Sequence, residues 1–275
     1  FGWTKPHCDV ILHEVVLEWA DRKLRFLSDD PATQADQVTV LRGDVNDPDL
    51  LAAIDACKVR YLPNLATLSA DAIFWCYTFD DSKWPHYIGT SGGWVQNNTL
   101  LSDENMRYAL NYAWNATEFI EGYYQGEAAT LHNPIIYGIA YANATKHSQM
   151  YYEKNIALAT YHFQQAWGGQ IWQWGFKLQI QPFPIADPRV VPCKWVVENE
   201  IAWPGTANVE VKVNPMAWRA GLIDMYSGLH GAYVVGWLAD FPHPHNWVFP
   251  FMHTHGDFSY FQNINYGHDS FGNRE

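Results

Sequence analysis

Strand-like and helix-like segments alternate through the second half of the chain, and this alternation restricts the fold more than any other feature. Phe176–Ile180 is a strand-like run, and Val209–Val213 alternates with the period of two that a half-buried strand shows. A helical pattern covers Val190–Ile201 between these runs, and another covers Met216–Leu229 before the strand-like run Ala232–Leu238. Strands separated by helices of this length predict βαβ units and an α/β sheet.

The fold class also indicates where a ligand should bind, because ligands of α/β sheets lie beyond the carboxyl ends of the strands. For the last predicted strand, this point is Trp237 to Asp240. We expect Asp240 to be a buried carboxylate at a strand end, where it suits an ammonium partner. A helix cap or a turn residue before Pro242 is the structural alternative for this side chain.

The first half of the chain is less regular. The β-branched runs Val10–Glu18 and Gln37–Leu41 predict strands, and Ala72–Phe79 predicts a buried strand. Pro48 is expected to begin a short helix that continues through Ile54, because proline fits the first helical turn.

Two helices are predicted in the middle of the chain, after a long loop. Trp84–Leu101 is rich in Gly and Asn and predicts the loop. Ser102 is expected to cap one helix, whose apolar face recurs at helical spacing until Gly126 ends it. The second helix is expected over about Tyr151–Trp167.

Tryptophan is unusually abundant, with 14 residues in a chain of 275. An exposed tryptophan in a cleft stacks on sugar rings or packs against peptide side chains, whereas most tryptophans belong to the core. We expect core positions for Trp19, Trp75, Trp114 and Trp195. Candidates for ligand contact are Trp237 and Trp247, which flank Asp240, and the loop residues Trp84, Trp94, Trp172 and Trp174.

Charge and composition exclude several classes of protein. The net charge of −12, from 17 basic and 29 acidic residues, argues against nucleic-acid binding, which needs clustered Lys and Arg. The apolar runs are far shorter than the roughly 20 residues of a membrane-spanning helix. The four cysteines are widely spaced without a C-x-x-C pair, which excludes a zinc ribbon and leaves one disulfide open.

One segment suggests an enzyme. Gly89–Gly93 matches G-x-S-x-G, the nucleophile elbow, with Ser91 as nucleophile and with Asp240 and His255 in the chain order of a triad. That motif requires a strand before it and a helix directly after it. Here the next predicted helix starts only after Ser102, so a serine hydrolase is kept as an alternative.

Histidines suggest a second alternative. His243 and His245 form one H-x-H pair, and His253 and His255 form another. In an extended segment, residues i and i+2 share a face, so two imidazoles can meet one metal ion. Prolines interleave the first pair, and surface-loop histidines are common. A nickel-type metal-binding module is therefore an alternative, and no residue is assigned as a metal ligand.

Three longer segments, in matching order and spacing, carry a family resemblance. Ser102–Ala113 looks like the helix motif d-x-x-V-R-x-A-l-n-y-A, and Tyr151–Gly168 is similar to y-x-x-x-x-A-k-x-L-l-x-e-A-G. Gly236–Pro244 (GWLADFPHP) looks like G-W-x-x-D-y-p-d-P. With Lys5-Pro6 and Arg42–Val45 they resemble the family 5 extracellular solute-binding proteins, the peptide, nickel and oligosaccharide receptors of ABC importers. The chain departs from these motifs at Met106, at Asn115-Ala116 and at His243.

The resemblance implies a periplasmic-binding-protein-like (type II) α/β lobe that is part of a two-lobed receptor. Residues 1–80 would supply strands and a helix of the first lobe and the inter-lobe region. Residues 81–275 would form the ligand-binding lobe, incomplete at its C-terminus. Asp240 would pair with a peptide amino terminus, and Trp237, Trp247, Trp84 and Trp94 would contact the ligand.

The implied function is to present a peptide or an oligosaccharide to a membrane ABC permease. Such a carrier performs no covalent chemistry, so we expect neither enzyme activity nor a cofactor. The resemblance further implies an extracellular or periplasmic monomer, anchored to the membrane through a segment that precedes Phe1.

Overall fold

The structure is a computed structural model that describes residues 18–30, 34–35, 47–60, 67–124, 126, 128–131, 135–142, 152–182 and 191–262. The chain forms two compact units, Phe1–Leu65 and Ala66–Glu275. The predicted strand Gln37–Leu41 lies outside the described residues, as does Val10–Glu18 except for its last residue. The predicted assignment of residues 1–80 and 81–275 to receptor lobes stays a prediction.

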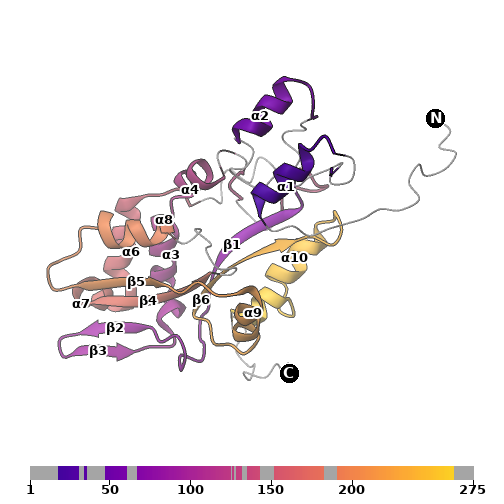
Figure 1. The fold of residues 1–275 in the computed structure, drawn as a ribbon. Coiled ribbons are helices and arrows are strands. Elements are labelled where there is room, and N and C mark those ends of the chain that lie inside the picture. The colour runs from indigo at the N-terminus through magenta and orange to yellow at the C-terminus, as the bar shows by residue number, and fades with distance from the viewer. Residues whose placement is uncertain are drawn as a thin grey trace. The chain divides into compact units, whose positions relative to one another are not determined.

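Two helices, α1 (Trp19–Phe26) and α2 (Pro48–Asp55), are described in the first unit (Figure 1). Helix α2 begins at Pro48 as predicted, and the Asp47 carboxylate caps it by accepting the Asp49 backbone N–H at 2.9 Å. The same carboxylate accepts hydrogen bonds from Trp19 of α1 at 3.1 Å and from Lys23 at 2.9 Å. The Lys23 ammonium lowers the pKa of Asp47 to about 2. One acidic side chain therefore ties α1 to α2.

A mixed sheet forms the centre of the second unit. Its strand order is β1 (Ser69–Trp75), β6 (Ala232–Leu238), β4 (Gly175–Pro182), β2 (Tyr87–Thr90) and β3 (Gly93–Gln96), and β5 (Asn208–Val213) also pairs with β4. Strand β4 runs parallel to β5 and to β6, whereas β1 pairs antiparallel with β6 over its whole length. Trp237 near the end of β6 lies opposite Ala70 in this register.

The parallel strands are joined by helices, as predicted. Helix α8 (Val191–Trp195) and the π-helical turn η5 (Val196–Glu200) connect β4 to β5. Helix α9 (Trp218–Tyr226) connects β5 to β6. These connections confirm the α/β fold with βαβ units.

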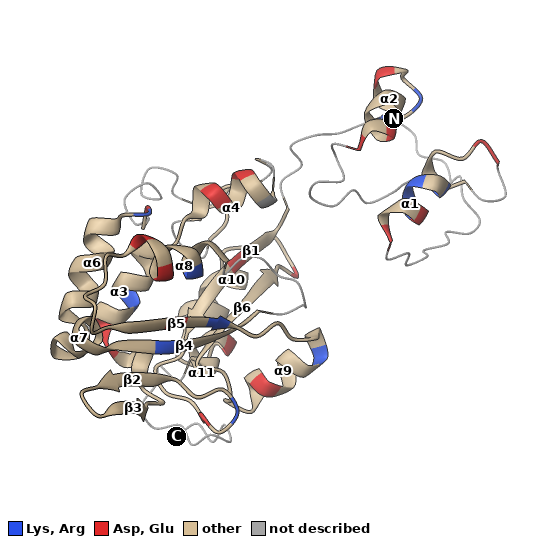
Figure 2. Ribbon diagram, turned by 60° about the vertical axis from the view of Figure 1, so that its left-hand side comes forward, with Lys and Arg blue, Asp and Glu red and all other residues tan. Residues whose placement is uncertain are grey.

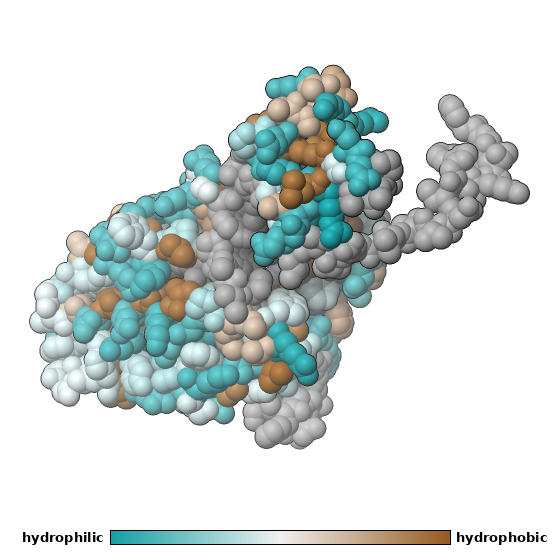
Figure 3. Space-filling view, viewed as in Figure 1, coloured by the Kyte–Doolittle hydropathy of each residue, from teal (hydrophilic) through white to brown (hydrophobic). Residues whose placement is uncertain are grey.

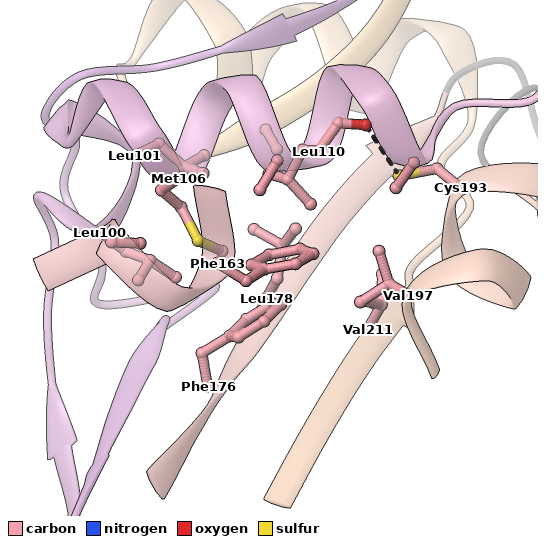
Figure 4. Close-up of a cluster of buried hydrophobic side chains, with 14 of the residues drawn as sticks. Leu100, Leu101, Met106, Leu110, Phe163, Phe176, Leu178, Cys193, Val197 and Val211 are labelled. Atoms are coloured by element: carbon pink, nitrogen blue, oxygen red, sulfur yellow. Dashed lines mark hydrogen bonds between the residues drawn. The ribbon is translucent and has the colours of Figure 1, made fainter. Parts of the chain in front are cut away.

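Helices cover both faces of the sheet (Figures 1 and 2). On one face, α3 (Glu104–Ala113) and α6 (Ile156–Gln165) pack with α8 in the main core. In this core Leu110 and Phe163 lie over Phe176 and Leu178 of β4, all four fully buried (Figure 4). On the other face lie α9 and α11 (Asp257–Phe261), with Phe74 and Tyr233 beneath them and α10 (His245–Met252) beside them. Shorter pieces are α4 (Ala116–Tyr123), α7 (Gln170–Trp174), η2 (Leu100–Ser102) and η3 (Ala166–Gly169).

The prediction of a long loop over Trp84–Leu101 is wrong, because part of this segment is the β2–β3 hairpin. Ser91 and Gly92 form its turn, in which the Thr90 hydroxyl donates to the Gly93 carbonyl at 3.1 Å. Gly93 has a φ of +127°, a conformation that favours glycine. Strands of four residues bounded by Gly and Asn carry too little periodicity to be recognised.

The predicted helix from Ser102 to Gly126 is interrupted at Trp114. Asp103, not Ser102, caps α3 by accepting the Met106 N–H at 3.0 Å. Asn115 then begins α4 by accepting the Glu118 N–H at 3.2 Å. The second predicted helix starts later for the same reason, since Asn155 caps α6. Strand β1 likewise ends at Trp75, before the predicted end at Phe79.

The expected core tryptophans are only partly buried. Trp75 is buried, Trp19 and Trp114 are half-buried, and Trp195 is 57% exposed, so its prediction is wrong. Cys76 and Cys193 are buried free thiols, and burial raises the pKa of Cys193 to about 12. Small apolar patches are scattered among hydrophilic residues on the face in Figure 3. No helix of the described segments is long and apolar enough to span a bilayer.

Candidate functional site

A shallow, open pocket lies where β6 ends and α10 begins. Its volume is about 170 Å³. The lining residues come from the strand end, the following turn and one face of the helix: Trp237, Asp240, Phe241, His245, Asn246, Phe249 and Pro250. The pocket therefore lies at the carboxyl end of a strand, the position predicted for a ligand.

The local fold brings these residues together through a tight turn. After β6, the Ala239 N–H still donates to the Leu68 carbonyl at 2.8 Å. The chain then turns at Phe241, whose carbonyl accepts the His243 N–H at 2.9 Å, and α10 starts after Pro244. Pro250 within α10 has no N–H, so the Asn246 carbonyl lacks its usual helical donor.

A buried amide connects the strand to the acidic side chain. The Trp237 indole N–H donates to Asn246 Oδ1 at 2.9 Å, and Asn246 Nδ2 donates to Asp240 Oδ2 at 3.4 Å. Because an indole N–H only donates, it fixes the Asn246 oxygen toward Trp237 and the amide hydrogens toward Asp240. Asn246 is 5% exposed, so packing also restrains it. The Asp240 carboxylate is thus held in place by a hydrogen bond from the Asn246 amide.

Among the described residues that line the pocket, Asp240 supplies a carboxylate and none supplies an ammonium or guanidinium group. Asp240 is exposed, so the expectation that it is buried is wrong; the turn carries it past the end of the sheet. None of the seven lining residues is Lys or Arg, and α10 itself carries no charged residue (Figure 2). His245 is the other titratable group in the lining. A cationic group would find an anionic partner here without displacing a protein cation.

Aromatic rings form the walls of the pocket. Trp237 is half-buried and meets Phe258 edge-to-face at 5.8 Å between ring centroids. Phe241 and Phe249 are 46% and 38% exposed. The pocket therefore combines one anionic group with exposed apolar surface.

The other predicted ligand contacts lie elsewhere. Trp247 is fully buried with Ala70 and Ile136, which agrees with core packing and not with ligand contact. Trp84 is half-buried, and its indole nitrogen lies 3.4 Å from Asp224 Oδ2. Trp94 lies on β3, with the Lys177 ammonium 4.6 Å from its ring centroid. Of the four predicted tryptophans, the structure brings only Trp237 to Asp240.

The remaining loop-like tryptophans, Trp172 and Trp174, are also outside this pocket. Trp172 packs against Trp203 of the main core at 5.2 Å between centroids. Trp174 ends α7, where its backbone lies close against Gly89 of β2. Neither residue lines the space around Asp240.

The structure does not form the nucleophile elbow. Ser91 lies in the turn between two strands, so a strand and not a helix follows it. The sharp strand-to-helix turn that exposes the nucleophile in this motif is therefore missing.

In the described part of the chain, each histidine pair makes a local hydrogen bond and gains no further side chain of the kind that binds metals. Within each pair the first imidazole Nδ1 accepts the backbone N–H two residues later, at 3.2 Å for His245 and 3.0 Å for His255. No cluster of three or more His, Cys, Asp or Glu suited to a metal occurs among the described residues. The histidines instead complete local turns.

Sequence reasoning missed four of the residues that line the pocket: Phe241, Asn246, Phe249 and Pro250. It indicated His245 only as half of a metal pair. The detectable signal was the spacing of His245, Phe249 and His253, which recur at i, i+4 and i+8 and share one face of a helix.

The comparisons give consistent results for sequence and fold. The family model described as "Bacterial extracellular solute-binding proteins, family 5 Middle" matches residues 40–259. A solved peptide-binding protein of a peptide ABC transporter has a TM-score of 0.50 and 15% identity, over 70% of this chain and 78% of that chain. This likeness shows the shared fold.

Two longer structures match less closely. DppA from Helicobacter pylori, in complex with the peptide STSA, has a TM-score of 0.44 and 20% identity over 72% of this chain and 33% of that chain. HbpA2 from Haemophilus parasuis has a TM-score of 0.47 and 17% identity over 76% of this chain and 38% of that chain. The match thus spans about a third of the first of these chains and less than two fifths of the second. None of the curated proteins matches it.

Proposed function

Because the chain belongs to the bacterial extracellular solute-binding proteins of family 5, we propose that it binds short peptides and holds their amino terminus at Asp240. Members of this family are receptors that capture a solute, which agrees with a pocket built for binding.

One observation carries this proposal: the exposed Asp240 carboxylate lies in an aromatic pocket that has no Lys or Arg in its lining. A peptide amino terminus is an ammonium group with adjacent apolar side chains, so it complements both parts of the pocket. Hydrogen bonds to charged groups contribute about 1.5–3 kcal/mol each. Asn246 holds one carboxylate oxygen and thereby reduces the freedom that Asp240 loses on binding.

An oligosaccharide is the competing ligand. Sugars are recognised by tryptophan faces together with many hydrogen bonds, but Trp84, Trp94 and Trp247 do not line the pocket. Trp237 is the one tryptophan in the pocket lining, and its indole N–H already donates to Asn246. The solved relative with the TM-score of 0.50 is itself a peptide-binding protein. These points favour a peptide.

The wider role follows from the same proposal. The protein would act outside the cytoplasmic membrane as a monomeric carrier that presents peptides to the permease of an ABC importer. It would carry out no covalent chemistry. The β2–β3 turn at Ser91, which lacks the elbow geometry, supports a carrier over a hydrolase.

A thermal-shift assay tests the proposal with three probes: tri-alanine, N-acetyl-tri-alanine and maltotriose. A ligand that binds only the folded state raises the melting temperature, and the rise grows with the logarithm of the ligand concentration relative to its dissociation constant. We expect tri-alanine to raise it and the other two to have little effect. A shift with maltotriose alone would replace the peptide proposal with a sugar receptor, and a flat response to all three would remove it.

A further inference from the structure

The outer face of α10 carries a column of stacked rings that the proposed binding of an amino terminus does not use. His245 stacks on Phe249 with centroids 5.4 Å apart and planes 16° apart, and Phe249 stacks on His253 at 4.8 Å and 19°. His245 and Phe249 lie one turn apart in α10, and His253 follows four residues later as the C-cap of the helix. We call His245, Phe249 and His253 the ring column.

The ring column ends in the pocket. His245 and Phe249 line it together with Asp240, whereas His253 lies one turn beyond it. Phe249 stacks on the His245 ring from within the column. His245 is exposed and lines the pocket, so its ring is accessible to a ligand.

The surroundings of the column are apolar and exposed. Phe241 and Phe249 of the pocket lining are 46% and 38% exposed, and Met252, the last residue of α10, is 62% exposed. Exposed apolar side chains that gather in a pocket with polar groups at its edge are typical of a ligand-binding site. The single charged group among them is Asp240, which lies on the pocket wall that His245 also lines.

We propose that His245 is a specificity residue that selects peptides with an aromatic first residue, whose ring extends the ring column while the amino group pairs with Asp240. The inference rests on the proposed function. In a peptide, the first side chain and the amino group leave the same Cα atom, so they reach adjacent sites. The Asp240 carboxylate and the His245 ring line the same pocket, whose volume is about 170 Å³. Charge complementarity and ring geometry thus point to the same occupant.

Calorimetric titration of the protein with four tripeptides tests this selection. The peptides end in Ala-Ala and begin with Phe, Tyr, cyclohexylalanine or Ala. Cyclohexylalanine has nearly the size of Phe without a π face, so it separates ring stacking from apolar burial. An aromatic pair contributes a preference of about 2- to 12-fold beyond burial. We expect the Phe and Tyr peptides to bind tighter than the cyclohexylalanine peptide by a factor in this range.

Two variants test whether the preference for aromatic peptides depends on the ring column. His245→Ala should bring the Phe peptide to the affinity of the cyclohexylalanine peptide while the Ala peptide keeps most of its affinity. Trp195→Ala, which removes an exposed aromatic residue from α8, should leave the preference unchanged. The proposal is overturned by equal binding of the Phe and cyclohexylalanine peptides to the wild type, or by a preference that survives in His245→Ala. Absence of binding for all four peptides would instead reject the proposed function itself, and this inference with it.

Discussion

Acid should destabilise the second unit through a buried neutral histidine, His86. This side chain is fully buried beside Phe79, and its Nε2 lies 3.1 Å from the Gln179 carbonyl. A carbonyl only accepts, so Nε2 carries the proton and Nδ1 does not. Burial lowers the pKa of His86 from 6.5 to about 4, which the hydrogen bond to Gln179 offsets only in part.

The sign and size of the effect follow from this shift. The unfolded state takes up a proton near pH 6.5, whereas the folded state resists it until about pH 4. The free energy of unfolding therefore falls as the pH drops from about 6.5 to about 4, and His86 does not change it at higher pH. At pH 5 the lowered pKa of His86 costs about 2 kcal/mol of unfolding free energy relative to pH 8. Burial also lowers the pKa of His230 to about 4, so His230 adds an effect of the same sign.

Urea denaturation at pH 8 and pH 5 measures this linkage. His86→Leu should lower stability at pH 8, because the Gln179 carbonyl loses a donor, but should reduce the loss between pH 8 and pH 5 by about 2 kcal/mol. The exposed His243→Ala variant is the matched control and should keep the wild-type loss. An unchanged loss in His86→Leu would refute the conclusion that His86 is neutral in the folded state.

Two further variants test the packing of the fold. Gly89→Ala should destabilise the protein by about 1–3 kcal/mol, because the added Cβ would overlap the Trp174 carbonyl. Gly92→Ala in the same hairpin meets no close atom and should change stability far less. Thermal denaturation of the two variants measures the difference. Leu110→Ala in the core of Figure 4 should cost about 2–5 kcal/mol in urea, and Leu24→Ala, at a residue 68% exposed, should cost much less. Similar losses within either pair would contradict the packing described here.

The elements that sequence patterns predict well have a clear, uninterrupted apolar pattern with a distinct end. Ala232–Leu238 was predicted with the bounds it has in the structure, because both its faces are apolar and a turn follows directly. At Asn115 the sequence pattern is misleading. Apolar residues continue at helical spacing, but the Asn115 side chain caps a new helix and so ends the continuity of the first one. The β2–β3 hairpin depends on partners distant in the chain, which local patterns do not contain.

The end of β6 and the resemblance around Asp240 both indicate the position at which the structure has a pocket, but not most of the residues that line it. The burial of Trp247 was not foreseeable, because the direction of one side chain depends on how α10 packs on β1 and β6. Asn246 was missed for a related reason: its role arises from hydrogen bonds to two residues that come together only in the folded turn.

The most direct test of the central claim is whether Asp240 recognises a peptide ammonium group. Calorimetry would compare tri-alanine with N-acetyl-tri-alanine on the wild type and on Asp240→Asn. Acetylation should weaken binding to the wild type by about 10- to 150-fold, the equivalent of one charge-assisted hydrogen bond, and should have little effect on Asp240→Asn. An equal loss in both proteins, or no loss in the wild type, would contradict the assignment of Asp240.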